Sequence, residues 1–336
     1  MTRLIQVLDP VGKRRVASVD GGGCHLIDGY ASVYDMALEA IEKGMGLADL
    51  IDECLSDDTV DYTAIHGGSS EWRLLPAFDH PGEPARCLVT GTGLTHKASV
   101  DNRQAMHEQG DSEKAEVTDS MRMYQWGLEG GKPKPGAIGT APEWFYKGNG
   151  TILKGHGEPL DVPPFSGDGG EEPEIAGAYL VDPDGHPRRV GLTMGNEFAD
   201  HVTEKRNYLY LAPSKLRQCS LGPELLLDGD FGNVAGEVSI ERGDAVLWSR
   251  TIATGEENMS HSLANMEHHH FKFPEHRRPG DVHIHFFGAD AFSFGDGIQL
   301  EDGDVMVVAW DGYGKELRNP IRTSKSDDRL IEVEPL

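Results

Sequence analysis

Two glutamates lie two positions apart at the start of a segment that has the composition of a β-strand. The segment reads Glu172-Pro173-Glu174 and continues with the apolar run from Ile175 to Leu180. Residues two apart in a strand point to the same face, so the two carboxylates are expected to meet at one centre. Two negative charges repel there unless a cation or a proton lies between them, which indicates a metal site or a raised pKa. The alternative is a solvated acidic edge, since Glu171 is acidic as well.

A third glutamate and a lysine complete a set of side chains that could act together. Glu197 follows the strand-like run from Val190 to Met194, and strand ends are where functional side chains tend to gather. Lys215 follows the apolar, aromatic run from Leu209 to Ala212, which should be partly buried. A buried lysine requires a nearby anion. The glutamates would then offer carboxylate oxygens to a hard cation, and the ammonium would meet the substrate or carry a proton.

Beyond these residues, a series of short motifs resembles the fumarylacetoacetate hydrolase superfamily from about Arg86 to Arg322. In chain order the motifs are Trp144-Phe145-Tyr146-Lys147, Glu172-Pro173-Glu174, Gly195-Asn196-Glu197, Ser214-Lys215 with Leu221-Gly222-Pro223, Arg278-Pro279-Gly280-Asp281-Val282, and Gly303-Asp304-Val305 with Leu317-Arg318-Asn319-Pro320. Each motif is weak alone, and their shared order makes the resemblance specific. Three stretches are similar to the sugar-acid branch, which includes GguC-like proteins associated with arabinose use and 2-keto-3-deoxy-pentonate dehydratases: Asn196-Glu197-Phe198, Asn207 to Tyr210, and Asn258 to Phe271.

The resemblance implies a catalytic domain with the mixed β-roll of the fumarylacetoacetate hydrolase C-terminal type, usually present as a homodimer. It also implies a Mg²⁺ ion held by Glu172, Glu174 and Glu197, with Mn²⁺ or Ca²⁺ as alternative ions. Many relatives carry aspartate where Glu197 stands, and the longer side chain still supplies an oxygen. Lys215 matches the active-site lysine of the superfamily, and Lys147 matches a second lysine near the substrate.

One histidine falls in a further match to the superfamily. The stretch from Gly91 to His96 resembles the glycine-rich loop that brings a histidine over the metal. In the hydrolase branch a glutamate follows that histidine three positions later and the pair activates water, but here the position holds Ser99. A serine cannot stabilise an imidazolium as a carboxylate can, so the water-activating dyad is incomplete. We expect His96 with Ser99 to orient a leaving hydroxyl, and the alternative for His96 is a turn histidine bonded to the backbone.

The other histidines invite a zinc interpretation. The sequence has 15 histidines, among them His268-His269-His270, His283 and His285. Two histidines separated by one residue share a face of a strand, which suits zinc. Adjacent histidines cannot all reach one ion, however, and no cysteine or acidic partner stands at a familiar zinc spacing, so zinc is not expected. We expect one histidine between His261 and His270 to line the substrate pocket.

The reaction that fits this set of residues is the dehydration of a 2-keto-3-deoxy sugar acid, a pentonate for preference, to 2,5-dioxopentanoate. A 2-oxo acid can chelate a hard cation, and polarising its C2 carbonyl stabilises the enolate formed when a C3 proton is removed. Lys215 would carry a proton or pair with the oxyanion, and Phe294 would form part of the pocket wall. Two alternatives stay open. One is an acylpyruvase-like hydrolase that cleaves the C3–C4 bond of a 2,4-dioxo acid, and the other is a sugar-acid-binding protein without catalysis.

Two groups of elements must position these residues. Apolar positions between about Gly29 and Leu55 recur at three- and four-residue spacing, which predicts a helix, a break at Gly44 and a second helix. A strand from Arg15 to Val19 joins them in a small α+β N-terminal domain, residues 1–85, which ends in a Pro/Gly-rich piece. Residues 86–336 are predicted to form the catalytic domain, with strands at Arg86–Thr90, Ile175–Val181, Arg189–Met194, Val282–Phe287 and Val305–Trp310. The predicted fold class is therefore α+β.

The composition limits the partners. The chain of 336 residues has 31 basic and 56 acidic side chains and a net charge of −25, which repels phosphate backbones and anionic lipids. Neither a nucleic acid nor a membrane is therefore an expected partner. No run approaches the roughly 20 apolar residues of a spanning helix, and the start lacks a secretory signal, which favours a cytoplasmic protein. The 4 cysteines form no CxxC pair, and no nucleotide-binding loop or serine-nucleophile elbow is present.

Overall fold

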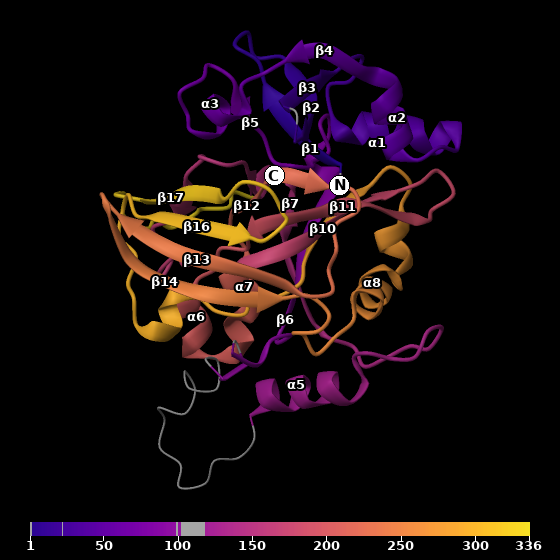
Figure 1. The fold of residues 1–336 in the computed structure, drawn as a ribbon. Coiled ribbons are helices and arrows are strands. Elements are labelled where there is room, and N and C mark those ends of the chain that lie inside the picture. Colours follow the sequence, from indigo (N-terminus) through magenta and orange to yellow (C-terminus); the bar gives the residue numbers. More distant parts are fainter. Residues whose placement is uncertain (1, 22, 99, 102–117) are drawn as a thin grey trace, which may run out of the picture.

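The computed structural model describes residues 2–21, 23–98, 100–101 and 118–336, and it shows a mixed α+β fold built on two β-sheets (Figure 1). The larger sheet has 12 strands in the order β4-β3-β2-β1-β12-β11-β10-β15-β6-β7, with β5 beside β1 and β8 beside β12. The smaller sheet has 5 strands in the order β14-β13-β16-β17-β9. Among the described residues, no helix is both long and apolar enough to cross a membrane.

The bounds of the elements follow the chain. The strands are β1 (Arg3–Leu8), β2 (Arg14–Asp20), β3 (Gly23–Ile27), β4 (Leu55–Thr59), β5 (Arg73–Leu74), β6 (Cys87–Gly93), β7 (Glu143–Asn149), β8 (Leu153–Lys154), β9 (Leu160–Val162), β10 (Pro173–Val181), β11 (Pro187–Asn196), β12 (Cys219–Leu226), β13 (Val234–Arg242), β14 (Ala245–Thr254), β15 (Val282–Phe286), β16 (Val305–Trp310) and β17 (Leu317–Thr323). The α-helices are α1 (Val33–Lys43), α2 (Leu47–Cys54), α3 (Tyr62–His66), α5 (Asp119–Gly130), α6 (His201–Arg206), α7 (Leu211–Lys215) and α8 (Leu263–Phe271).

The β10–β11 hairpin forms the centre of the larger sheet. Every residue of β10 is buried, because neighbouring elements cover both of its faces. The antiparallel register pairs Pro173 with Asn196 and Glu174 with Gly195. The start of β10 and the end of β11 therefore lie side by side, at the end of the hairpin opposite its turn. The sheet thus brings together residues that are more than twenty positions apart in the sequence.

The N-terminal strands extend this same sheet. β1 pairs with β12 in antiparallel register, with Arg3 opposite Leu226. The guanidinium of Arg3 lies 2.7 Å from the carboxylate of Glu224, and the hydroxyl of Tyr62 donates to the same carboxylate at 2.7 Å. One hydrophobic core joins both parts of the chain, since Leu4 and Met36 belong to the same buried cluster as Ala178. The division into domains at residue 85 stays a prediction, and the two parts share a sheet and a core.

The smaller sheet covers the other side of the central hairpin. The two layers share a second buried hydrophobic cluster. In it, Ile175 and Met194 of the hairpin lie with Val238 of β13 and Trp310 of β16. In Figure 1, β13, β14, β16 and β17 lie together beside the larger sheet, and the N-terminal helices α1 and α2 lie over its far end. The central hairpin is thus enclosed on both faces, which keeps solvent away from the residues at its open end.

Most of the elements predicted from the sequence are present. The helix break occurs at Gly44, which ends α1 with a left-handed backbone at a φ of 66°. A residue without a Cβ adopts that conformation at no steric cost, which explains the glycine. The predicted strands correspond to β2, β6, β10, β11, β15 and β16. The mixed α+β class is confirmed, and the β-roll description of the catalytic part stays a prediction.

Candidate active site

Three buried carboxylates meet at the open end of the β10–β11 hairpin. Glu172 immediately precedes β10, Glu174 is its second residue, and Glu197 directly follows β11. One oxygen of each lies within 4.8 Å of the others. The backbone N–H of Glu197 donates to the Glu172 carbonyl at 2.9 Å, and the Asn196 side-chain oxygen accepts from the Glu172 N–H at 3.1 Å. The structure thus brings together the three predicted ligands, and their burial excludes the solvated acidic edge.

Two buried lysines neutralise part of this charge. The ammonium of Lys215 lies 2.5 Å from Glu172 Oε1 and 2.6 Å from Glu197 Oε2. The ammonium of Lys147 lies 2.5 Å from Glu197 Oε1 and donates to the carbonyls of Phe198 at 2.7 Å and Lys215 at 3.0 Å. Lys147 thus donates to two backbone carbonyls and forms an ion pair with Glu197. Lys215 lines the cavity at the site, whereas neither Lys147 nor Glu197 is part of the cavity wall.

Burial makes the remaining negative charge costly. Burial raises the pKa of Glu174, and the neighbouring carboxylates of Glu197 and Glu172 raise it further. Burial also raises the pKa of Glu197, to about 7, although Lys147 and Lys215 act against it. Burial pushes the pKa of Glu172 in the same direction, but Lys215 and His201 outweigh it and hold that pKa well below its usual range. A negative charge on Glu174 is therefore unfavourable unless a cation lies beside it.

The donor set fits the divalent cation that the family resemblance implies. Carboxylate oxygens are the ligands that Mg²⁺ and Ca²⁺ prefer, and the three oxygens are close enough to reach one ion. Glu174 Oε2 accepts a hydrogen bond of 2.6 Å from the backbone N–H of Gly288. No lysine or arginine of the described residues forms an ion pair with Glu174, so a cation would supply the missing positive charge. Glu172, Glu174 and Glu197 would hold it, and this role stays a prediction.

The cavity wall contains two ionisable residues, His201 and Glu204, that the sequence did not single out. The wall consists of Gly93, Leu94, Phe145, Glu172, Glu174, His201, Glu204, Lys215, Gly288, Ala289 and Phe292. His201 and Glu204 both come from α6, and they are 2% and 6% exposed. His201 Nε2 lies 3.0 Å from Glu172 Oε1, and its ring stacks on Phe292 with the centroids 4.7 Å apart. The three-residue spacing of His201 and Glu204 could have indicated that they share a helix face, but the same spacing is common on exposed helices.

The remaining predicted site residues lie outside this cavity wall or outside the described residues. His96 is 1% exposed, and its two ring nitrogens lie 2.9 Å from Thr95 Oγ1 and 3.1 Å from Thr254 Oγ1. Burial lowers the pKa of His96 to about 3. Ser99 is not among the described residues, so its predicted partnership with His96 stays a prediction. The ring centroids of Phe294 and His201 lie 5.2 Å apart. Phe294 is not part of the cavity wall, which contains Phe292 instead.

The histidines around α8 form a separate cluster. His270 Nε2 lies 2.9 Å from His283 Nδ1, and the ring of His285 lies 4.6 Å from that of His270. His285 is held between the hydroxyls of Thr90 and Thr92, each at 2.7 Å. The expectation that a histidine between His261 and His270 lines the pocket is wrong for this cavity, whose histidine is His201. The described histidines form no group with the geometry of a metal site among themselves.

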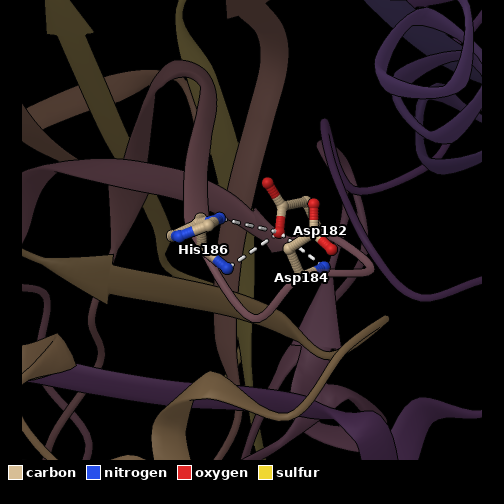
Figure 2. Close-up of side chains that lie close together, drawn as sticks. All are labelled: Asp182, Asp184 and His186. Atoms are coloured by element: carbon tan, nitrogen blue, oxygen red, sulfur yellow. Dashed lines mark hydrogen bonds and ion pairs between the residues drawn. The ribbon is translucent and has the colours of Figure 1, made fainter.

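A second group with potential metal ligands lies at the turn of the β10–β11 hairpin, and Figure 2 shows its three side chains. Asp182 Oδ1 accepts hydrogen bonds from the backbone N–H groups of Asp184 at 3.0 Å and His186 at 2.8 Å. Asp182 Oδ2 accepts a further bond of 2.8 Å from Arg188. Asp184 and His186 are exposed. Asp182 therefore stabilises the turn, and the structure gives no separate sign of a ligand there.

Solved structures share this fold. A 2-keto-3-deoxyarabinonate dehydratase aligns with a TM-score of 0.70 at 19% identity, over 96% of this chain and 100% of that one. A structure of 2-keto-3-deoxy-D-arabinonate dehydratase complexed with magnesium and 2,5-dioxopentanoate has a TM-score of 0.68 at 18% identity, with the same coverage. The 5-carboxymethyl-2-hydroxymuconate delta-isomerase from Mycobacterium smegmatis has a TM-score of 0.57 at 16% identity, again over 96% and 100% of the two chains.

These likenesses establish the fold alone, because the identities are below one residue in five. They agree with the resemblance to the fumarylacetoacetate hydrolase superfamily that the motifs indicated, since the neighbours are its sugar-acid dehydratase and isomerases. No model of a known protein family matches the chain, and no curated protein matches it. The function must therefore be argued from the site.

Proposed function

We propose that this protein is an enzyme of the sugar-acid branch of the superfamily. It is a metal-dependent dehydratase that converts a 2-keto-3-deoxy sugar acid, a pentonate for preference, to 2,5-dioxopentanoate. The observation that carries the proposal is the buried trio of Glu172, Glu174 and Glu197 beside the buried ammonium of Lys215. The proposal is supported by the fold shared with 2-keto-3-deoxy-D-arabinonate dehydratase.

The cavity chemistry suits an α-keto acid. A divalent cation, Mg²⁺ for preference and Mn²⁺ or Ca²⁺ as alternatives, would offset the charge of the three glutamates and stabilise the enolate form of a 2-oxo acid. Leu94, Phe145, Ala289 and Phe292 add apolar surface to the wall, which helps to exclude water from a bound substrate. The ring of Phe145 lies 5.0 Å from the Lys215 ammonium and holds that charge in place.

Lys215 is placed to pair with negative charge that develops on the substrate. Burial alone would lower the pKa of Lys215, but the carboxylates of Glu172 and Glu197 outweigh it and raise the pKa above its ordinary value. With no cation at the trio, the side chain is therefore an ammonium at neutral pH. An ammonium suits the predicted pairing with an oxyanion, and a bound cation would offset the two carboxylates and lower this pKa. Lys147 is absent from the cavity wall and forms an ion pair with Glu197, so we assign it to holding Glu197.

The hydrolase alternative requires an activated water, which in that branch a histidine provides. His96 does not line the cavity, and Thr95 and Thr254 lie within hydrogen-bonding distance of its nitrogens. This geometry favours the dehydratase over a C–C bond hydrolase of 2,4-dioxo acids. A sugar-acid-binding protein without catalysis would use the same site, and only turnover separates it from an enzyme.

The experiment is to incubate the purified protein and Mg²⁺ with 2-keto-3-deoxy-pentonates and, separately, with acylpyruvates. We expect 2,5-dioxopentanoate from a pentonate, detected as an aldehyde, and no pyruvate from an acylpyruvate. The variant Lys215→Met should lose the activity, because the oxyanion loses its partner. Release of pyruvate would support the hydrolase instead, and tight binding without any product would support the binding protein. Either result would contradict the proposal.

The proposal includes a homodimer, for which one face of the molecule is suited. β7 is the last strand of the larger sheet, and its outward side chains Trp144 and Tyr146 are 38% and 43% exposed. The neighbouring segment adds exposed Tyr208, Leu209 and Tyr210. An exposed edge strand with aromatic neighbours is a surface that proteins commonly cover.

A further inference from the structure

His201 is a buried side chain of the cavity wall to which the proposed function gives no role. It is the first residue of α6, and it is 2% exposed. Its Nε2 lies 3.0 Å from Oε1 of Glu172, one of the three predicted metal ligands. The other ring nitrogen, Nδ1, is buried and has no hydrogen-bond partner among the described residues. The polar contact of this ring is therefore made by Nε2.

This contact determines which ring nitrogen donates. A carboxylate that binds a cation has no proton of its own, so it can only accept a hydrogen bond. The proton shared with Glu172 must then belong to Nε2 of His201. With its proton on Nδ1 instead, the ring would bury an N–H without an acceptor, and Glu172 would lack this donor. The geometry thus makes His201 a donor to Glu172.

The surroundings of His201 hold its ring in one position. The ring of Phe292 is stacked on it, with centroids 4.7 Å apart and planes 10° apart, and the ring of Phe294 lies 5.2 Å away. Gly170 lies so close that a Cβ at this position would come within 2.5 Å of Nδ1. A glycine at position 170 therefore leaves the space that the imidazole occupies.

The start of α6, which carries His201, is also fixed. The carboxylate of Asp200 caps the N–H of Thr203 at 2.9 Å and lies 3.1 Å from the guanidinium of Arg217. Asp168 Oδ1 accepts a hydrogen bond of 3.1 Å from the N–H of Val202. The backbone on both sides of the histidine is thus held by carboxylates outside the trio.

Two carboxylates of the trio have one oxygen held by a protein donor that is not itself a predicted ligand. Glu174 Oε2 accepts from the backbone N–H of Gly288 at 2.6 Å, and Glu172 Oε1 accepts from His201. Lys215 lies 2.5 Å from that same oxygen of Glu172, but it also contacts a second carboxylate of the trio. The hydrogen bond of His201 is made to Glu172 alone among the described residues.

We propose that His201 is a positioning residue for the metal ion: it holds Oε1 of Glu172 and thereby leaves Oε2 for the cation. The inference rests on the metal site of the proposed function. A ligand that is already oriented loses less freedom when the ion binds, and removal of such a partner typically lowers metal affinity about 10- to 100-fold. This role requires no substrate, so it can be measured without turnover.

The test compares two variants that separate the hydrogen bond from the ring. Mn²⁺ is titrated into each protein without substrate, and the free ion is followed by electron paramagnetic resonance. His201→Phe keeps an aromatic ring for the stack but loses the N–H, so its Mn²⁺ affinity should fall about 10- to 100-fold. His201→Gln loses the ring but keeps an N–H at a similar reach, so it should retain most of the affinity. A ring that served packing alone would give the opposite order.

His156→Phe is the matched control. The Nε2 of His156 lies 3.0 Å from the carbonyl of His66, and the two rings are 4.0 Å apart. His156 thus combines one such contact with a ring contact, but it is not part of the cavity wall. His156→Phe should keep the wild-type Mn²⁺ affinity. Glu174→Ala should lose the site, which identifies the Mn²⁺ bound elsewhere on the acidic surface, and urea unfolding without metal verifies that each variant is folded.

The outcomes separate this inference from the proposed function. If Glu174→Ala loses Mn²⁺ while His201→Phe binds it as the wild type does, or if His201→Gln is as weak as His201→Phe, His201 does not position the ligand and the proposed function stands. If the variants behave as expected but the wild type acts on no pentonate, the positioning role is correct and the dehydratase assignment fails. If Glu174→Ala binds Mn²⁺ like the wild type, both are overturned.

Discussion

The two lysines of the site show how burial assigns different roles to the same side-chain type. Both were predicted to act near the substrate, but only Lys215 lines the cavity. Two backbone carbonyls and the Glu197 carboxylate surround the ammonium of Lys147, which makes it a fixed support for Glu197. A sequence motif identifies the lysine, and only the packing decides which way its ammonium points.

Replacement of Lys147 by methionine should therefore affect stability and metal binding together. The change leaves Glu197 buried with one cation fewer, which typically costs about 3 to 5 kcal/mol for a broken buried pair. We expect lower stability in urea unfolding and weaker Mn²⁺ binding in calorimetry.

The control for this variant is Lys154→Met. Lys154 is partly exposed and lies 3.9 Å from Glu158, a pair that should contribute less than about 1 kcal/mol. If Lys147→Met kept wild-type stability and metal affinity but had a raised KM, Lys147 would instead contact the substrate.

Among the elements, the β10–β11 hairpin determines the geometry of the site. Its register places Glu174 beside the end of β11, and a slip of one residue would send these side chains to the opposite face. The turn at the other end is held by Asp182, through two backbone N–H groups and Arg188. The turn and the site thus lie at opposite ends of the same hairpin.

Asp182→Ala should destabilise the fold by about 2 kcal/mol at neutral pH, since a buried carboxylate that accepts several hydrogen bonds is lost. Burial alone would raise the pKa of Asp182, but the N–H of His186 and the guanidinium of Arg188 outweigh it and lower the pKa. A lowered pKa in the folded state contributes stability above the ordinary pKa, and this contribution disappears as the pH falls through the folded value.

The difference between wild type and Asp182→Ala should therefore shrink as the pH falls below about 4, the ordinary pKa of an aspartate, as measured by urea unfolding. Asp184→Ala is the matched control, because it keeps the backbone N–H that donates to Asp182. An equal loss of stability in both variants, or a difference that does not change with pH, would contradict the role given to Asp182.

The elements were predictable where one local pattern decides them. The helix break at Gly44 and the strands β10, β11 and β15 follow from periodicity and turn residues. Glu172 and Glu174 were found because alternation along a strand fixes their common face. His201 and Glu204 were missed because α6 has only six residues and follows an irregular loop, so no periodic pattern pointed to the cavity.

At the scale of the whole molecule, the N-terminal part shares the larger sheet with the rest of the chain. β1 pairs with β12, and Glu224 of β12 holds both Arg3 and Tyr62. A domain boundary at residue 85 is predicted from the sequence because a Pro/Gly-rich stretch ends the first group of elements. Pairing between strands that are more than two hundred residues apart leaves no local signal, and for that reason the shared sheet could not be foreseen.

The net charge of −25 affects how measurements of metal binding are interpreted. Such a chain attracts divalent cations to its surface in general, so bulk binding alone does not locate a site. Asp182, Asp184 and His186 form a second group with suitable atoms, which makes the location of the ion decisive.

The central claim is that Glu172, Glu174 and Glu197 hold one divalent cation. The most direct measurement is an anomalous difference map from a crystal of the protein soaked in Mn²⁺. We predict one strong peak at about 2.2 Å from a carboxylate oxygen of each glutamate. An empty position among the three carboxylates, with or without a peak at the hairpin turn, would contradict the account.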